Sequence, residues 1–333
     1  MRTAVLSLWT GAFICAACGG SSGSSSTPIA PTAPSVPPPP TAVTFTGHLT
    51  STGRVDALPN VSVDLGGLKT VTGPDGAFSY RFQPGTTSRL TFSADSIVPR
   101  SLVVAVAETR GFDVDAIALS TGFDLAFYRQ LLRDDHDSPG TLRPLRRWTT
   151  TPQVYLKTVD ELGESIHAGT LDVIAAVIAD AVPRWTGGRL ATPTIIRGTE
   201  TREGQHGWIT VKFPAGNTAI EGYCGQAQVA VDGGWIALGY HVPPTAAGTC
   251  RVPEYVIAPT TIRHEVGHAL GLFHTDSSSD LMWGGTWSKA DQLPSARELY
   301  HAAIAYQRPV GNVDPDTDPT SSVNLAPFRI AIP

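Results

Sequence analysis

Hydrophobic and polar residues alternate along most of the stretch from residue 44 to residue 120. Five runs of β-branched and aromatic residues have the two-residue period of half-buried strands, and glycine-rich turns separate them. These runs begin at residues 43, 61, 78, 90 and 102. Roughly seven short strands in one such span are typical of a small β-sandwich. We therefore predict a small all-β sandwich domain over residues 44–120.

From residue 123 onward, the hydrophobic pattern becomes a mixture of helical and strand-like periods. Leu171, Ile174, Ile178 and Val182 recur at helical spacing, and a Gly-Gly pair at 187 ends that pattern. Further helices are predicted at 123–133, 260–271 and 295–307, and strands at 152–157, 194–199, 207–213, 226–231 and 235–242. The chain is thus predicted to be α+β, with a mixed domain over residues 123–310 after the sandwich.

The first eighteen residues have the composition of an export signal. Met1 and Arg2 supply a short positive start, and the apolar run from Ala4 to Ala17, about fourteen residues, is too short to span a bilayer. Cys18 follows two small residues and precedes a Gly- and Ser-rich stretch, which resembles the lipobox of bacterial lipoproteins. The resemblance implies that residues 1–18 are a lipoprotein signal peptide and that Cys18 carries the lipid. An ordinary cleaved signal peptide is the alternative.

Residues 19–43 are rich in Ser and Gly and then in Pro, so they cannot bury a core and are predicted to be a linker. We therefore expect an exported protein of the bacterial cell envelope, attached to a membrane by the lipid on Cys18. The residue after Cys18 is Gly19 and not Asp, which by resemblance to the lipoprotein sorting pattern implies the outer membrane in a Gram-negative host. Under the alternative, the protein is secreted.

Residues 311–333 are rich in Asp and Pro and then apolar, and they form a C-terminal tail to which the sequence assigns no place. Asp314, Asp316 and Asp318 alternate as in some calcium loops, but the glycine and the terminal glutamate of such a loop are missing. We therefore expect a solvated acidic tail.

Composition and charge narrow the class of protein. Hydrophobic residues make up 41% of the chain and charged residues 16%, which excludes a wholly disordered chain. The net charge is −5, with 24 Lys and Arg against 29 Asp and Glu and no long run of either sign. The basic surface that a nucleic-acid-binding protein needs is therefore not expected, and we predict a monomer with no nucleic-acid partner.

Four cysteines are too few for a disulfide scaffold but can be used in pairs. In an exported chain whose Cys18 is acylated, Cys224 and Cys250 remain as partners for each other. We predict a disulfide bond between them, with two free thiols as the alternative.

Residues 264–274 read His-Glu-Val-Gly-His-Ala-Leu-Gly-Leu-Phe-His. On a helix, His264 and His268 lie four residues apart on one face, which is the spacing needed to chelate one Zn²⁺ ion. Glu265 sits beside them and can reach a water molecule without being a ligand itself. His274 would be about 15 Å away along an unbroken helix, but Gly271 can adopt a positive φ, end the helix and turn the chain back.

This HExxHxxGxxH pattern resembles the metzincin clan of zinc endopeptidases, and the likeness extends over roughly residues 123–307. It implies a metzincin-like fold, one catalytic zinc ion, and a protein or peptide substrate. In the family, three histidines bind zinc, a glutamate is the general base and a methionine-containing turn lies beneath the metal. The matching residues are His264, His268 and His274 for zinc, Glu265 for the base, and Met282 for the turn. Residues 58–63 and 70–78 resemble the carboxypeptidase regulatory-like modules of secreted bacterial proteins.

Two functional hypotheses follow from these motifs. The first is a surface-tethered zinc endopeptidase. The second is a non-catalytic, zinc-containing binding or adhesion lipoprotein, against which the intact Glu265 argues, because an inactive relative could lose the base at no structural cost. The other histidines are scattered, and we expect them to be exposed or satisfied within the core.

Overall fold

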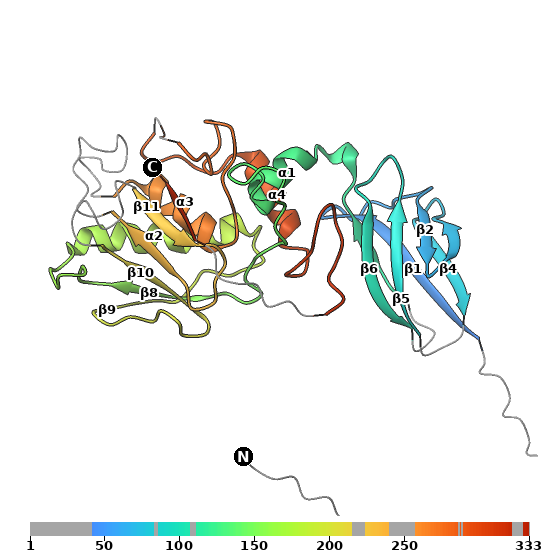
Figure 1. Cartoon of the computed structure of the whole chain (residues 1–333), viewed down its shortest axis with the longest axis horizontal. Coiled ribbons are helices and arrows are strands. Elements are labelled where there is room, and N and C mark those ends of the chain that lie inside the picture. The colour runs from blue at the N-terminus through green and yellow to red at the C-terminus, as the bar shows by residue number, and fades with distance from the viewer. Residues whose placement is uncertain are drawn as a thin grey trace, which may run out of the picture. The chain divides into compact units, whose positions relative to one another are not determined.

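The fold is described from a computed structural model that covers residues 42–82, 86–106, 111–214, 224–239, 257–285, 287, 289–321 and 329–332. The predicted signal peptide, nearly all of the predicted linker, Cys18 and Cys250 lie outside these residues. Within the described part, helices and several β-sheets occur in one chain, in agreement with the predicted α+β class (Figure 1).

Seven strands are described between residues 43 and 116, and they form two sheets. The first sheet has the order β4 (Ala77–Phe82), β1 (Val43–Ser51), β7 (Val114–Ala116). The second has the order β3 (Leu68–Val71), β2 (Ser62–Leu65), β5 (Thr86–Ser93), β6 (Arg100–Val106). The buried positions alternate along β1 and β2, and both sheets contribute to one apolar cluster. Phe78 of the first sheet meets Phe92 of the second edge to face at 5.5 Å between ring centroids, so the two sheets share this core.

The second part of the described chain has one sheet and four α-helices. The sheet has the order β13 (Arg329–Ile332), β11 (Gly225–Gln228), β12 (Trp235–Leu238), β10 (Trp208–Lys212), β8 (Gln153–Lys157), β9 (Ile195–Gly198). The four strands from β12 to β9 run parallel, whereas β11 is antiparallel to both of its neighbours. Strand β13 was not anticipated from the sequence, because its pairing partner lies about one hundred positions earlier.

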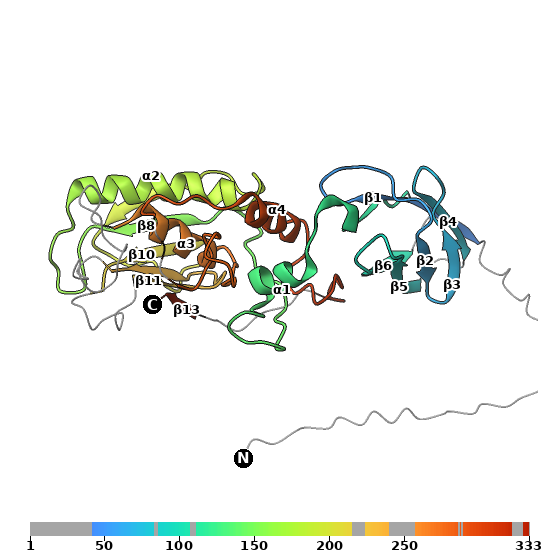
Figure 2. The ribbon, with the colours of Figure 1, turned by 90° about the horizontal axis from the view of Figure 1, so that it is seen from above.

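The helices of this part are α1 (Leu125–Arg133), α2 (Ala168–Trp185), α3 (Pro259–Ala269) and α4 (Ala296–Ala305). Helix α2 buries the apolar face that its spacing predicted, and Gly187 and Gly188 adopt positive φ after its end. Trp185, which is fully buried, donates a hydrogen bond from Nε1 to the carbonyl oxygen of Arg263 at 3.0 Å. This bond joins α2 to α3, the helix that carries the histidine motif. The two helices pack against each other (Figure 2).

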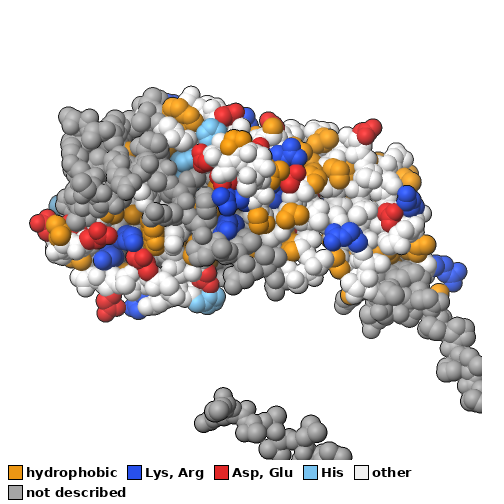
Figure 3. Space-filling model, in the orientation of Figure 1, with side chains coloured by type: hydrophobic (Ala, Val, Ile, Leu, Met, Phe, Trp, Pro, Cys, Tyr) orange, Lys and Arg blue, Asp and Glu red, His pale blue; other side chains and the backbone are white. Residues whose placement is uncertain are grey.

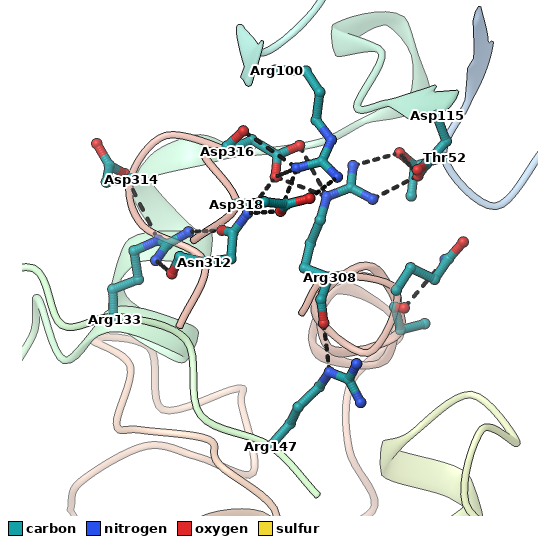
Figure 4. Close-up of polar contacts among 12 residues, drawn as sticks. Thr52, Arg100, Asp115, Arg133, Arg147, Arg308, Asn312, Asp314, Asp316 and Asp318 are labelled. Carbon is teal, nitrogen blue, oxygen red and sulfur yellow. Dashed lines mark hydrogen bonds and ion pairs between the residues drawn. The ribbon is translucent and has the colours of Figure 1, made fainter. Parts of the chain in front are cut away.

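A cluster of charged and polar side chains, most of them buried, connects the strands of residues 43–116 to the segment after α4. We call it the Arg308 cluster; it contains Thr52, Arg100, Asp115, Arg308, Asn312, Asp316 and Asp318 (Figure 4). Arg308 contacts Asp316 through Nε and Asp115 through Nη1, and Arg100 contacts both Asp316 and Asp318. Two separate apolar cores thus meet at a polar contact within residues 40–333, which form one compact unit.

The prediction of a solvated acidic tail was wrong for residues 314–318. Asp316 is only 1% exposed, and Asp314 is paired with Arg129. The basic partners lie as far as 218 positions away along the chain, so a local sequence pattern could not indicate them. A carboxylate can be buried when arginines donate hydrogen bonds to it and balance its charge. Residues 314–318 are therefore part of the packed structure and not a solvated tail.

The surface of the described residues carries charges of both signs in a mixed arrangement. On the face seen in Figure 3, Lys and Arg side chains lie interspersed with Asp and Glu side chains. Within the described ranges, no helix is long and apolar enough to cross a membrane.

Candidate metal centre

Helix α3 places two of the three motif histidines on one face inside the protein. Every residue from Pro259 to Ala269 is buried. One N-terminal donor of the helix has a partner outside it, since Thr260 donates from its backbone nitrogen to the carbonyl oxygen of Ala290 at 3.0 Å. The Nε2 atoms of His264 and His268 lie 2.8 Å apart, as the four-residue spacing on a helix requires.

The third histidine reaches the same point because the helix ends before it. The last helical residue is Ala269, and Gly271 has φ +109°. A side chain at Gly271 would also place its Cβ 2.2 Å from the carbonyl oxygen of Arg146, so only glycine fits this turn. The chain then brings His274 to α3, and ligand atoms of the three histidines all lie within 4.8 Å of one another.

Each histidine has a hydrogen-bond partner at Nδ1. His264 donates to the carbonyl oxygen of Leu281 at 2.7 Å, and His268 donates to that of Leu272 at 2.8 Å. His274 donates to Oδ2 of Asp137 at 2.8 Å. Carbonyl oxygens can only accept, so Nδ1 of His264 and of His268 must carry the proton. In each neutral ring, Nε2 is therefore left with a free lone pair.

These lone pairs fit a bound cation. Burial, and then the neighbouring histidines, hold the pKa of His264 and of His268 well below the usual value of 6.5, so both rings are neutral. Two lone pairs 2.8 Å apart repel each other unless a positive ion lies between them. Nε2 of His274 is buried and has no hydrogen-bond partner among the described residues. Three buried histidines could therefore hold one metal ion.

Glu265 follows His264 in the motif, and its carboxylate has no hydrogen-bond partner among the described residues. The side chain is fully buried, and neither of its oxygens accepts a hydrogen bond from any described residue. Burial raises the pKa of this carboxyl well above its usual value of 4.5. Strand β11 packs against it so closely that a Cβ at Gly225 would stand 2.4 Å from Oε1 of Glu265. The carboxylate is thus buried on the helix that carries His264 and His268, with both oxygens free of hydrogen bonds from the described residues.

Met282 lies in a buried turn that packs against α3. Its Sδ atom would be 2.6 Å from a Cβ at Gly267, so the glycine inside the motif makes room for the sulfur. Glu298 of α4 holds this turn, because its carboxylate accepts hydrogen bonds from the backbone nitrogens of Leu281 at 3.0 Å and Met282 at 2.7 Å. The Leu281 carbonyl that orients His264 belongs to the same turn.

Several residues at this site were not identified from the sequence. Gly225 and Gly267 leave space that a side chain would fill, and the carboxylate of Glu298 accepts hydrogen bonds from backbone nitrogens. The residue types alone do not indicate these roles. Asp137 is 137 positions from its partner His274. Trp287 packs edge to face on His264 at 4.9 Å between ring centroids.

The other sequence-predicted residues lie apart from the metal centre or outside the described residues. His301 accepts a hydrogen bond from the backbone of Asp124 and is a satisfied core residue. His206 is exposed and pairs with Asp232. Cys224 is buried, but its predicted partner Cys250 is outside the described residues, so their pairing stays a prediction.

Comparison with known proteins identifies no family for this chain. No protein-family model matches the sequence. No curated protein matches it either.

Three solved structures are similar to the chain in part. A DUF3823 family protein from Parabacteroides merdae is 19% identical over 24% of this chain and 47% of its own, with a TM-score of 0.21. A putative membrane-associated protein of unknown function from Bacteroides fragilis is 18% identical over 25% of this chain and 30% of its own, with a TM-score of 0.21. Metalloproteinase-II from Bacteroides fragilis is 10% identical over 80% of this chain and 92% of its own, with a TM-score of 0.31.

This chain spans less than half the length of the first two of these structures. At TM-scores of 0.21 to 0.31, the three likenesses carry no argument about fold or function. A functional conclusion therefore has to rest on the geometry of the metal centre.

Proposed function

We propose that this protein is a zinc endopeptidase, with His264, His268 and His274 as metal ligands and Glu265 as the general base. The observation that carries the proposal is that ring nitrogens of the three histidines, one from each, lie within 4.8 Å of one another. Nε2 of His264 and of His268 is left unprotonated, because Nδ1 of each ring donates to a carbonyl oxygen. The resemblance of residues 264–274 to the metzincin motif supports the same reaction class.

Three neutral imidazoles leave a Zn²⁺ ion its full charge and an open position, so that when bound it lowers the pKa of a water ligand toward about 7 and polarises a carbonyl group. Glu265 moves the proton. Its carboxylate accepts a proton from the attacking water, whose oxygen bonds to the carbonyl carbon of the peptide. The carbon–nitrogen bond then breaks, and Glu265 returns the proton to the leaving amine. A buried carboxylate that no described residue engages is suited to both transfers.

Removal of the third ligand tests the metal assignment. We expect His274→Ala to lose zinc on dialysis against a mild chelator, because two imidazoles are too few for tight binding. Metal content is read by elemental mass spectrometry, and cleavage of an unstructured protein is followed before and after zinc is restored.

His206→Ala, which changes an exposed histidine, should keep both zinc and activity. Equal zinc occupancy in His274→Ala would exclude His274 as a ligand. Zinc without any cleavage by the wild type would instead favour the non-catalytic binding lipoprotein.

We also propose that the protein is exported and lipid-anchored through Cys18, with Cys224 paired to Cys250. The apolar run before Cys18 and the flexible stretch after it support the anchor. Mass spectrometry of protein purified from membranes without reduction should find acyl groups on Cys18 and one cross-linked peptide that contains Cys224 and Cys250. A mature N-terminus without acylated Cys18 would contradict the anchor, and two alkylated thiols would contradict the disulfide.

A further inference from the structure

The three histidines of the metal centre differ in what holds them. His264 and His268 are on α3, and each donates from Nδ1 to a neutral carbonyl oxygen. His274 lies beyond the end of that helix and donates instead to the carboxylate of Asp137 at 2.8 Å. The third ligand is therefore the one that receives a charged partner, and the partner comes from a distant segment.

We propose that Asp137 is a positioning residue that fixes the ring of His274 as the third metal ligand. This inference rests on the proposed function of the histidines as ligands. A carboxylate at Nδ1 keeps the proton on that nitrogen, sets the angle of the ring and makes Nε2 a stronger donor to a metal. It also supplies a negative charge that partly balances the ion, which the two carbonyl oxygens do not.

The segment that carries Asp137 is built as a defined loop. Helix α1 ends at Arg133, and the next residue, Asp134, adopts φ +64° and pairs through its carboxylate with Arg143 at 2.5 Å. Asp135 accepts a hydrogen bond from the backbone of Gly140 at 2.9 Å, and Ser138 donates from its backbone to the carbonyl of Asp134 at 3.0 Å. These bonds close the loop on both sides of Asp137.

The loop and the third ligand are attached to the same helix. The backbone nitrogen of Phe273, immediately before His274, donates to the carbonyl oxygen of Leu131 in α1 at 2.7 Å. Asp137 and His274 are thus both held against the end of α1, which limits how far they can move apart. The side chain of His274 is 5% exposed and that of Asp137 is 36% exposed, so solvent reaches the carboxylate but hardly reaches the ring.

The hydrogen bond of the pair agrees with this role. A carboxylate without a proton can only accept, so the bond from Nδ1 to Oδ2 leaves the proton on Nδ1 of His274 and the lone pair on Nε2.

The experiment compares zinc affinities of the full chain with and without this contact. The zinc dissociation constant is measured by competition with a chelator for the wild type, Asp137→Ala and Asp137→Asn. The control is Asp172→Ala, which removes an exposed carboxylate that pairs with Arg197 and not with a histidine. We expect zinc binding about 10- to 100-fold weaker in Asp137→Ala. Asp137→Asn should lose less, because its amide oxygen still accepts, and Asp172→Ala should stay within about twofold of the wild type.

A second measurement separates positioning from loss of structure. The visible spectrum of the Co²⁺-substituted protein reports the ligand field directly, and it should change in Asp137→Ala and Asp137→Asn but not in Asp172→Ala. Should the wild type fail to bind zinc, the proposed function itself is wrong. If the wild type binds zinc and both Asp137 variants match it in affinity and in Co²⁺ spectrum, the role of Asp137 is overturned. If Asp137→Ala does not fold, a wild-type affinity and spectrum for Asp137→Asn overturn that role on their own.

Discussion

Replacement of Glu265 by glutamine is expected to slow peptide hydrolysis by about 10²- to 10⁴-fold, while the protein keeps its fold and its zinc. Glutamine has nearly the same shape as glutamate, so the close packing of Gly225 against this side chain is preserved. The amide cannot accept the proton of the attacking water, and this is the step lost. None of the three histidines hydrogen-bonds to Glu265, so their partners at Nδ1 are unchanged.

The measurement is kcat/KM on an unstructured peptide, together with zinc per chain and the temperature of unfolding. Glu161→Gln, which changes an exposed glutamate, is the matched control and should have wild-type activity. A Glu265→Gln variant with zinc bound and a rate near that of the wild type would show that Glu265 is not the base.

Removal of the Asp316 carboxylate is expected to destabilise the protein by about 3–5 kcal/mol, because it leaves buried charges without their partner. Asp316 accepts from Arg308 at 2.8 Å, from Arg100 at 3.1 Å and from Asn312 at 2.9 Å (Figure 4). Arg308 is fully buried and keeps one further carboxylate partner, Asp115.

The free energy of unfolding is measured by urea titration for Asp316→Ala at low and at high salt. Asp180→Ala is the control, since Asp180 forms an exposed pair with Arg184 one helical turn away and should contribute less than about 1 kcal/mol. The loss in Asp316→Ala should persist at high salt, because salt screens buried pairs much less than exposed ones. Equal losses in the two variants would mean that the Arg308 cluster contributes no more than a surface pair.

The sequence by itself determined the features that depend on local spacing. The 3.6-residue period of a helix places His264 and His268 on one face, and a glycine at 271 allows the helix to end before His274. Alternation along the strands at 43, 61, 78 and 90 predicted strands that the structure contains, because a half-buried sheet exposes every second residue. These rules relate residues that are close together in the sequence, so they can be applied without knowledge of the fold.

Only the tertiary structure decided which distant groups meet. Asp137 and His274 are 137 positions apart, and Arg100 and Asp316 are 216 positions apart, so no local period relates them. The same applies to β13, whose pairing with β11 depends on where residues 329–332 return to the sheet. The local sequence around an aspartate in a polar, proline-rich stretch is the same whether its carboxylate faces water or pairs with a buried arginine. The fold determines which of the two occurs, because it alone sets the distance between the charges and their access to solvent.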